Sequence, residues 1–205
     1  MSITLAVLLT LAAQCAPSVH PETLSAIVGH ESGGNPLALH VNGSNQPVPP
    51  QNREEAVSLA RQLISEGKSV DLGLMQINSD NLEWLGMSIE DTFDPCKNLA
   101  AGSRILEENY QRAHRQKGQE QVALYAALSA YNTGNQTAGI KNGYVQKVVE
   151  NSTYKVPAIS AVAELKPEPA PEWDVFGGEE VADTHWDAFS STNKEEGPIE
   201  NRVNN

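Results

Sequence analysis

The sequence predicts an α+β fold that is mostly α-helical, with a small β element and a disordered acidic tail at the C-terminal end. Apolar residues recur at helical spacing in several segments between residues 21 and 151. Residues 69–78 read as a short extended segment between these helices. Residues 157–205 follow neither period and are rich in Glu, Asp, Asn, Ser and Gly, which bury too little to offset the entropy of ordering.

The N-terminal segment, residues 1–17, has two interpretations. Residues 3–13 form a largely apolar run that resembles the hydrophobic region of a signal peptide, although no Lys or Arg precedes it. The alternative is that the run is the first, buried helix of the folded domain. The sequence leaves both interpretations open.

Residues 18–156 predict one domain built mainly of helices. A helix that starts at Pro21 stops at the glycine pair 33–34, and Asn52 caps a second helix that ends at Gly67. Three further helices are expected: one starting at Asp94-Pro95, a strongly apolar and central one at 119–131, and a last one at 142–151.

The charge is unevenly spread and excludes several classes of function. The chain has 205 residues, of which 14 are basic and 26 acidic, so its net charge is −12. Residues 157–205 contribute −8 and residues 1–156 contribute −4. Nucleic-acid binding is not expected, because phosphate neutralisation needs clustered Lys and Arg. The 2 Cys residues are too few for a four-Cys zinc site, and no apolar run reaches the roughly 18 residues of a transmembrane helix.

The composition of the tail predicts a flexible segment whose aromatic residues could bind a partner protein. It opens with a Pro-rich linker at residues 166–171 and continues with many acidic residues. Aromatic residues in such a segment can become ordered on a partner protein, although they can equally be incidental. The aromatic residues concerned are Trp173, Phe176, Trp186 and Phe189.

The first motif with chemical content is His-Glu-Ser-Gly-Gly-Asn-Pro at residues 30–36. Glu31 lies in the last turn of its helix, where the helix dipole and apolar neighbours both raise a carboxyl pKa. A carboxyl that stays protonated near neutral pH can act as a general acid, although a single Glu at a helix end is more often simply solvated. His30 lacks the second His of a His-Glu-x-x-His zinc site, so neither a metal nor another cofactor is expected.

Two further motifs supply polar groups between apolar residues. Gln76 and Asn78, in Asp-Leu-Gly-Leu-Met-Gln-Ile-Asn, combine amide groups with apolar neighbours, which suits an N-acetylated sugar. Tyr131, in Ala-Tyr-Asn-Thr-Gly, ends a buried helix, so its hydroxyl needs a polar partner. A carboxyl in the same cleft and a backbone carbonyl are the two candidate partners.

Together and in this order, the three motifs resemble the catalytic domain of the soluble lytic transglycosylases of the lysozyme-like superfamily, over roughly residues 15–150. The surroundings of Cys15 and Cys96 resemble the transglycosylases of type IV secretion and conjugal-transfer systems. The resemblance implies a lysozyme-like fold, a periplasmic location, peptidoglycan glycan strands as substrate and local opening of the cell wall. It also implies components of the secretion or conjugation apparatus as partners of the tail.

The resemblance further implies a role for each matching residue. Glu31 would be the sole catalytic acid and base, and Tyr131 would hydrogen-bond to it and orient it. The residues expected to bind or hold the substrate are Ser32, Met75, Gln76, Asn78, Tyr131 and Asn132. Cys15 and Cys96 would form a disulfide in an oxidising compartment, with two buried free thiols as the alternative.

The implied reaction cleaves the bond between MurNAc and GlcNAc without water and leaves a 1,6-anhydro ring on MurNAc. Its 2-acetamido group assists, so no second carboxylate is required. Two alternatives stay open. Asp71 opposite Glu31 would allow a hydrolytic, lysozyme-type mechanism with two carboxylates. A scaffold that docks on peptidoglycan and acts through its tail is the other alternative.

Overall fold

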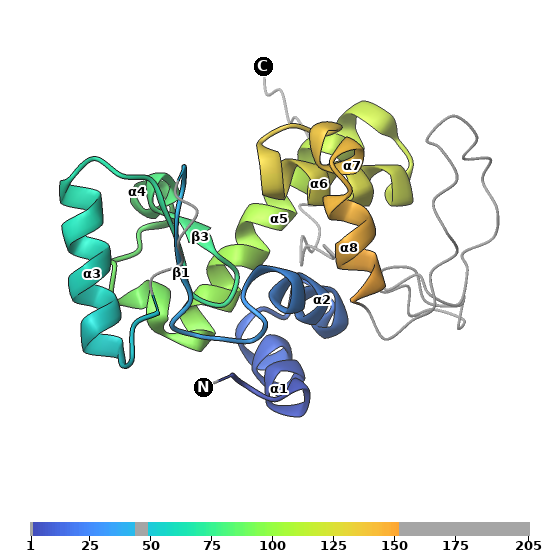
Figure 1. The fold of residues 1–205 in the computed structure, drawn as a ribbon. Helices are drawn as coiled ribbons and strands as arrows, with labels where there is room; N and C mark the ends of the chain where they lie inside the picture. Colours follow the sequence, from blue (N-terminus) through green and yellow to red (C-terminus); the bar gives the residue numbers. More distant parts are fainter. Residues whose placement is uncertain (1, 44–48, 152–205) are drawn as a thin grey trace, which may run out of the picture.

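The structure, a computed structural model, describes residues 2–43 and 49–151, so the predicted tail and its boundary at residue 157 lie outside the described residues (Figure 1). The helices are α1 (Leu5–Cys15), α2 (Pro21–Glu31), α3 (Arg53–Ser65), α4 (Leu82–Leu85), α5 (Pro95–Lys117), α6 (Glu120–Thr133), α7 (Ala138–Lys141) and α8 (Tyr144–Glu150). The strands are β1 (Leu39–Val41), β2 (Val70–Leu72) and β3 (Ile77–Asn78), and the 3-10 turns are η1 (Ser79–Asn81) and η2 (Asp91–Phe93). The prediction of a mostly helical fold with a small β element is confirmed.

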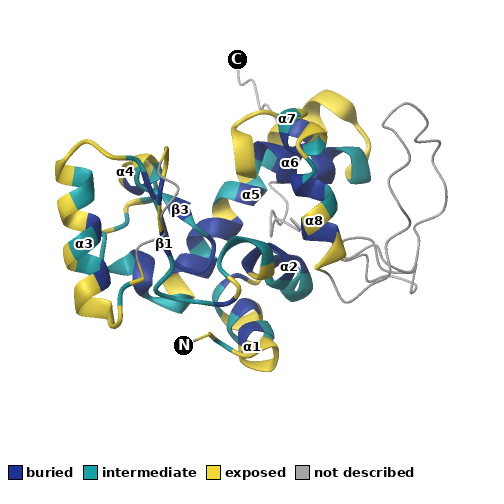
Figure 2. Cartoon of the chain, in the orientation of Figure 1, coloured by how far each residue is buried: buried dark blue, intermediate teal, exposed yellow. Residues whose placement is uncertain are grey.

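Helix α5 connects two parts of the molecule. In Figure 1 it runs from the part that holds α3, α4 and the strands to the part that holds α2, α6, α7 and α8. Its main partner is α6, whose buried face carries small residues such as Ala123 and Ala127. Small side chains let the two helix axes approach closely, so this pair forms much of the core, which Figure 2 shows in dark blue.

The sheet is antiparallel, with the strands in the order β1, β2, β3. Asp71 pairs with His40 on one side and with Asn78 on the other. The expected single extended segment is therefore two strands, which are joined by a tight turn at residues 73–76. Gly73 has φ +76°, and a Cβ atom there would lie 2.1 Å from the carbonyl oxygen of Thr92. Only glycine combines this backbone conformation with so close an approach, and its place in the turn explains why the extended segment is interrupted.

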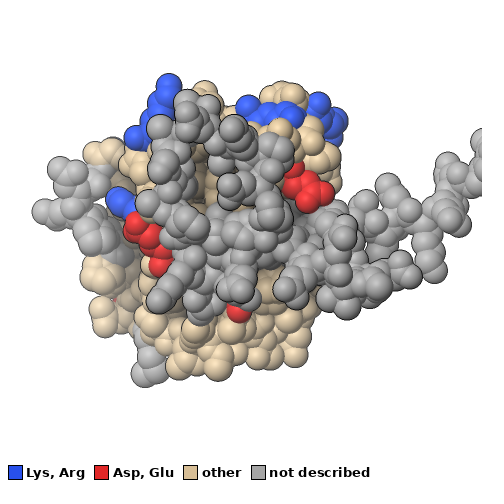
Figure 3. Space-filling model, turned by 90° about the vertical axis from the view of Figure 1, so that its right-hand side faces the viewer, with Lys and Arg blue, Asp and Glu red and all other residues tan. Residues whose placement is uncertain are grey.

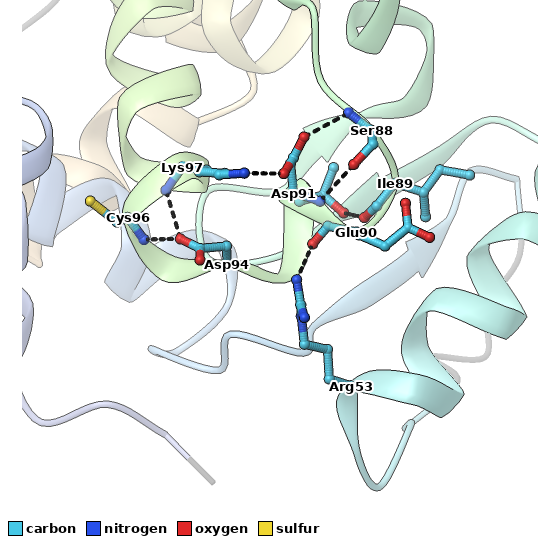
Figure 4. Close-up of polar contacts among 9 residues, drawn as sticks. Arg53, Ser88, Ile89, Glu90, Asp91, Asp94, Cys96 and Lys97 are labelled. Atoms are coloured by element: carbon cyan, nitrogen blue, oxygen red, sulfur yellow. Dashed lines mark hydrogen bonds and ion pairs between the residues drawn. The ribbon is translucent and has the colours of Figure 1, made fainter.

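Helix α3 is attached to the loop that precedes α5. The side-chain oxygen of Asn52 accepts from the N–H of Glu55 at 2.8 Å, which is the predicted cap. Arg53 donates to the backbone carbonyl of Glu90 at 2.9 Å (Figure 4). Arg61, two turns along α3, pairs with the carboxylate of Glu90. Two arginines on one face of α3 thus hold the same residue.

The start of α5 is fixed by acidic side chains. Asp94 caps the helix, because its Oδ1 accepts from the N–H groups of Cys96 and Lys97 at 3.0 Å each. The Lys97 ammonium group forms an ion pair with Asp91 in η2 (Figure 4). Asp91 also accepts from the N–H of Ser88 at 3.0 Å. These local contacts fix where the longest helix of the described chain begins.

Helix α1 is part of the packed fold. It contacts α2 and α5, and its Leu8 and Ala12 are buried. The sulfur of Cys15 at its end is bonded to that of Cys96 in the first turn of α5. In the structure, residues 3–13 therefore lie mainly in the first helix of the domain, and the implied disulfide is present. The outer face of α1 is largely exposed (Figure 2).

A buried amide joins α5 to the turn between β2 and β3. Asn98 is fully buried, and its Oδ1 accepts from the N–H of Met75 at 2.8 Å. Its Nδ2 donates to the carbonyl oxygens of Leu72 at 3.0 Å and Thr92 at 2.8 Å. All of its hydrogen-bonding groups have backbone partners, which makes it a fixed link between helix and sheet.

The surface of the described part carries both signs of charge. On the face shown in Figure 3, the described Lys and Arg side chains lie mainly toward the upper edge, with described Asp and Glu side chains below them. Within residues 2–43 and 49–151, no helix has the length and apolar character needed to cross a membrane. The same residues contain no cluster of three or more metal-binding His, Cys, Asp or Glu side chains.

Candidate active site

A cleft of about 570 Å³ is lined by the sheet and its following turn on one side and by α5, α6 and the end of α2 on the other. Five of the residues predicted to form the site line it, namely Glu31, Gln76, Asn78, Tyr131 and Asn132. Ser32 and Met75 are not among the described residues that line the cleft. Ser32 caps α2, and its hydroxyl donates to the carbonyl of Val28 at 3.3 Å.

Glu31 is the last residue of α2 and is only partly exposed. Burial raises the pKa of its carboxyl from the ordinary value to about 7. The hydrogen bond from Tyr144 lowers this pKa, and the negative charge of Asp71 raises it, but burial is the largest of the three effects. A carboxyl whose pKa lies close to neutral pH suits a group that must first donate a proton and later accept one.

The residue that orients Glu31 is Tyr144. Tyr144 is the first residue of α8. Its hydroxyl donates a hydrogen bond to Oε1 of Glu31, with 2.6 Å between the two oxygen atoms. The ring of His30 meets the Tyr144 ring edge to face, with 5.0 Å between centroids. Burial, and to a lesser degree Lys147, lowers the pKa of His30, so its imidazole is neutral and packs against the tyrosine. The sequence predicted a helix over residues 142–151 and assigned no role in the site to Tyr144.

Tyr131 does not have the role that the resemblance implied. Its hydroxyl donates to the carbonyl oxygen of Met75 at 2.8 Å rather than to Glu31. The alternative partner, a backbone carbonyl, is therefore the one observed. Because the N–H of Met75 is bonded to Asn98, both backbone groups of Met75 have protein partners. The N–H of Met75 is thus engaged with the protein, while its carbonyl oxygen keeps one further lone pair as an acceptor.

The two amides predicted to bind sugar are largely engaged with the protein. Nδ2 of Asn78 donates to Oδ1 of Asp71 at 2.7 Å and to Ser69, and its Oδ1 accepts from Asp80. Nε2 of Gln76 donates to the carbonyl of Gly73 at 2.8 Å. Gln76 has φ +48°, a conformation that a non-glycine residue adopts rarely and at a cost in energy. Asn78 thus positions Asp71, and Gln76 stabilises the turn and leaves its Oε1 as an acceptor.

Asp71 lies in the same cleft as Glu31. Burial raises the pKa of its carboxyl, while hydrogen bonds from Asn78 and Asn42 act in the opposite direction. Amide donors stabilise the charged form of Asp71, whereas in the described part of the chain the hydroxyl of Tyr144 is the donor to Glu31. The two carboxyls therefore lie in different environments.

The wall formed by η1, α4 and α5 was not identified from the sequence. Trp84 lines the cleft with 39% of its surface exposed. Its Nε1 donates to Oδ1 of Asn81 at 2.9 Å, and the guanidinium of Arg104 lies 4.9 Å from the ring centroid. A fixed and exposed indole in a polar cleft offers a flat apolar surface for a sugar ring. Trp84 follows no local motif, so only the fold reveals it.

Asn132 lines the cleft, as expected. Its Oδ1 accepts from Nδ2 of Asn142 at 3.1 Å, and the residue is exposed. It follows Tyr131 at the end of α6, where the chain turns toward α7. The contact with Asn142 links this end of the cleft to the segment that precedes Tyr144.

The small sheet, the helical part and the cleft with its partly protonated carboxyl define a lysozyme-like domain. Such domains cleave bonds between amino sugars, and a carboxylic acid protonates the leaving oxygen. The arrangement could serve hydrolysis or transglycosylation, since both begin with this proton transfer.

Comparison with known proteins identifies the family. The chain belongs to the transglycosylase SLT family, whose domain model matches residues 9–153. It is 44% identical over 167 residues to the type IV secretion system protein virB1 of Brucella suis, which covers 78% of this chain and 70% of that protein. It is 38% identical over 169 residues to the protein virB1 of Agrobacterium fabrum, with 81% and 69% covered. No solved structure matches it. The chain is a peptidoglycan lytic transglycosylase.

Proposed function

We propose that Glu31 is the single acid and base with which this lytic transglycosylase cleaves the MurNAc-GlcNAc bond of peptidoglycan. The observation that carries the proposal is the environment of its carboxyl. Burial raises the pKa of Glu31 to about 7, and the hydroxyl of Tyr144 fixes one of its oxygens at 2.6 Å. A group that is held in place and has a pKa close to neutral pH can both donate and accept a proton.

In the first step, Glu31 donates its proton to the glycosidic oxygen, and the bond from this oxygen to C1 of MurNAc breaks. The electron pair leaves with the oxygen, so positive charge develops at C1. The oxygen of the substrate's own 2-acetamido group stabilises this charge. The nearby carboxylate of Asp71 stabilises it electrostatically, because its charge acts across a partly buried cleft.

In the second step, the Glu31 carboxylate takes the proton from the 6-hydroxyl group of the same sugar. The 6-oxygen then bonds to C1 and closes the 1,6-anhydro ring. Glu31 is thereby protonated again, the proton that it donated stays on the 4-hydroxyl of the released GlcNAc, and no water is consumed. Tyr144 stays hydrogen-bonded to the carboxyl in both steps and stabilises its charged form between them.

Asp71 supports a second candidate, because its place in the cleft would also allow hydrolysis with two carboxylates. We expect the purified protein to release anhydro-muropeptides, and the Asp71→Asn variant to release the same products more slowly. Product identity is expected to persist because Asp71 neither moves a proton nor attacks C1 in the proposed scheme. Mass spectrometry of the digest checks this. Products heavier by one water in the wild type would instead assign hydrolysis.

The Tyr144→Phe variant is expected to move the alkaline limb of the pH–rate profile upward. The tyrosine hydroxyl lowers the pKa of Glu31, so its removal raises that pKa further above 7. The acid then stays protonated to higher pH, so the variant keeps its activity up to a higher pH than the wild type does. A hydrogen bond to a charged group is worth about 1.5 kcal/mol or more, so a displacement of about one pH unit is expected. A profile of kcat/KM against pH for both proteins measures it, and a downward displacement would contradict the assignment.

We also propose that the enzyme acts in the periplasm and opens the wall for a type IV secretion or conjugation apparatus. Support for the apparatus is the likeness to two proteins named virB1, of which the Brucella suis protein is named as a type IV secretion system protein. Support for the compartment is the disulfide between Cys15 and Cys96, since disulfides persist mainly in oxidising compartments. The tail, through which we expect components of the apparatus to bind, lies outside the described residues.

A further inference from the structure

One face of α5 forms the wall of the cleft. Ile105, Glu108, Asn109 and Arg112 all line it, and their spacing of three, four and seven residues places them on one side of a helix. These residues come from the half of α5 that follows its contact with the sheet. This wall is separate from the two carboxyl groups of Glu31 and Asp71 and from the amide side chains of Gln76 and Asn78.

Arg112 is the one basic residue that lines the cleft in the described part of the chain, whereas three acidic residues line it. Of these acids, Glu108 is paired with Arg104 at 3.8 Å, and Arg104 is the residue that covers the Trp84 ring. The guanidinium of Arg112 is exposed. Within residues 2–43 and 49–151, no ion pair or hydrogen bond engages it.

We propose that Arg112 is a binding residue for a carboxylate on the lactyl substituent of MurNAc. This proposal rests on the proposed function, and it names the part of the substrate that the α5 wall recognises. A guanidinium offers a planar pair of N–H donors that matches a carboxylate. The hydroxyl and acetamido groups of the glycan are neutral, so the carboxylates of the polymer lie on this substituent.

Two sources supply such a carboxylate. In a peptide-bearing strand, the lactyl group is amide-linked, and the free carboxylates belong to the peptide. In a strand from which an amidase has removed the peptide, the lactyl carboxylate itself is free. Both sources offer Arg112 the same chemistry at different distances from the sugar ring.

The test is a cycle of two changes, one in the protein and one in the substrate. Wild-type enzyme and Arg112→Gln are compared on peptide-bearing peptidoglycan and on the same material with its carboxyl groups converted to amides. We expect amidation to lower the kcat/KM of the wild type by about three- to tenfold, because the pair is partly exposed. We expect Arg112→Gln to show that loss already on the native substrate and to lose nothing more on the amidated one.

Arg115→Gln is the matched control. Arg115 is an exposed basic residue on the same helix, and it does not line the cleft in the described structure. Its variant should behave as the wild type on both substrates. High salt should shrink the difference between wild type and Arg112→Gln, because it screens an exposed charge pair. Equal losses for Arg112→Gln on native and amidated substrate would overturn the proposal, and so would no loss on the native substrate.

A third substrate, amidase-treated strands, identifies the source of the carboxylate. A loss on the peptide-bearing substrate assigns a peptide carboxylate, because the lactyl group is amide-linked there. A difference between wild type and Arg112→Gln that persists on amidase-treated strands shows that Arg112 also binds the free lactyl carboxylate, and a difference that disappears restricts recognition to the peptide. Failure of the underlying function gives a separate result. If Glu31→Gln kept its activity on all substrates, the catalytic assignment would fall, whereas failure of Arg112 recognition alone would leave the requirement for Glu31 intact.

Discussion

The Glu31→Gln variant is expected to release muropeptides about 10²- to 10⁴-fold more slowly than the wild type. This is the usual contribution of a general acid and base to the rate. Glutamine has nearly the same shape but can neither donate the proton to the glycosidic oxygen nor accept one from the 6-hydroxyl. Release of soluble anhydro-muropeptides from purified peptidoglycan measures the loss.

The fold of Glu31→Gln should be intact. The wild-type carboxyl is partly buried and its pKa is raised by burial, so a neutral amide relieves a desolvation cost at pH above 7. We expect a melting temperature no lower than that of the wild type. Glu22→Gln is a suitable control, because Glu22 lies in the first turn of the same helix and away from the cleft. Wild-type turnover in Glu31→Gln would refute the assignment.

The same variant separates an enzyme from a scaffold in the cell. If the chain opens the wall, a strain whose own copy is replaced by Glu31→Gln should lose type IV secretion or conjugation as a deletion strain does. Immunoblotting must show that the variant accumulates normally. Full secretion by the Glu31→Gln strain would favour a scaffold that acts by binding, as left open by the sequence.

Removing the disulfide, by Cys15→Ser together with Cys96→Ser, is expected to lower the free energy of unfolding by about 4 to 5 kcal/mol. The two residues are 81 positions apart, and closing so long a loop restricts the unfolded chain strongly in the chain-entropy account. For a domain of this size, that loss corresponds to a fall of roughly 10 °C in Tm. Urea denaturation followed by circular dichroism measures the free energy.

Reduction provides the control for the cysteine variant. The wild type, reduced and alkylated, should unfold like the double variant, and reductant should have no effect on the double variant itself. Because α1 also packs on α2 and α5 through Leu8 and Ala12, the reduced protein should stay folded at low temperature. Identical stability of oxidised and reduced wild type would contradict the expectation.

The helices could be predicted because their signals are local. Pro21 and the glycines after Glu31 bound α2, Asn52 caps α3, and Asp94 caps α5. Each of these residues acts on backbone groups within a few positions of itself. The break between β2 and β3 was missed because the turn depends on the close approach of Gly73 to Thr92, and that contact exists only in the folded chain.

The environment of the Glu31 carboxyl could be predicted for the same reason, and its hydrogen-bond partner could not. The position of Glu31 at a helix end is indicated by the residues next to it in the sequence. The choice between Tyr131 and Tyr144 depends on how α6 and α8 pack against α2, and both hydroxyls come from the same helical part of the molecule. No helix or motif was predicted around Trp84, and Arg112 stands on the helix predicted to start at Asp94-Pro95, so their place in the cleft follows only from the fold.

The backbone of Met75 is held from two helices at once, with its N–H on Asn98 of α5 and its carbonyl on Tyr131 of α6. The turn between β2 and β3 is thereby joined to both helices at a single residue. These two hydrogen bonds fix the sheet side of the cleft relative to α5 and α6, and with it the position of the cleft wall that lies near Glu31.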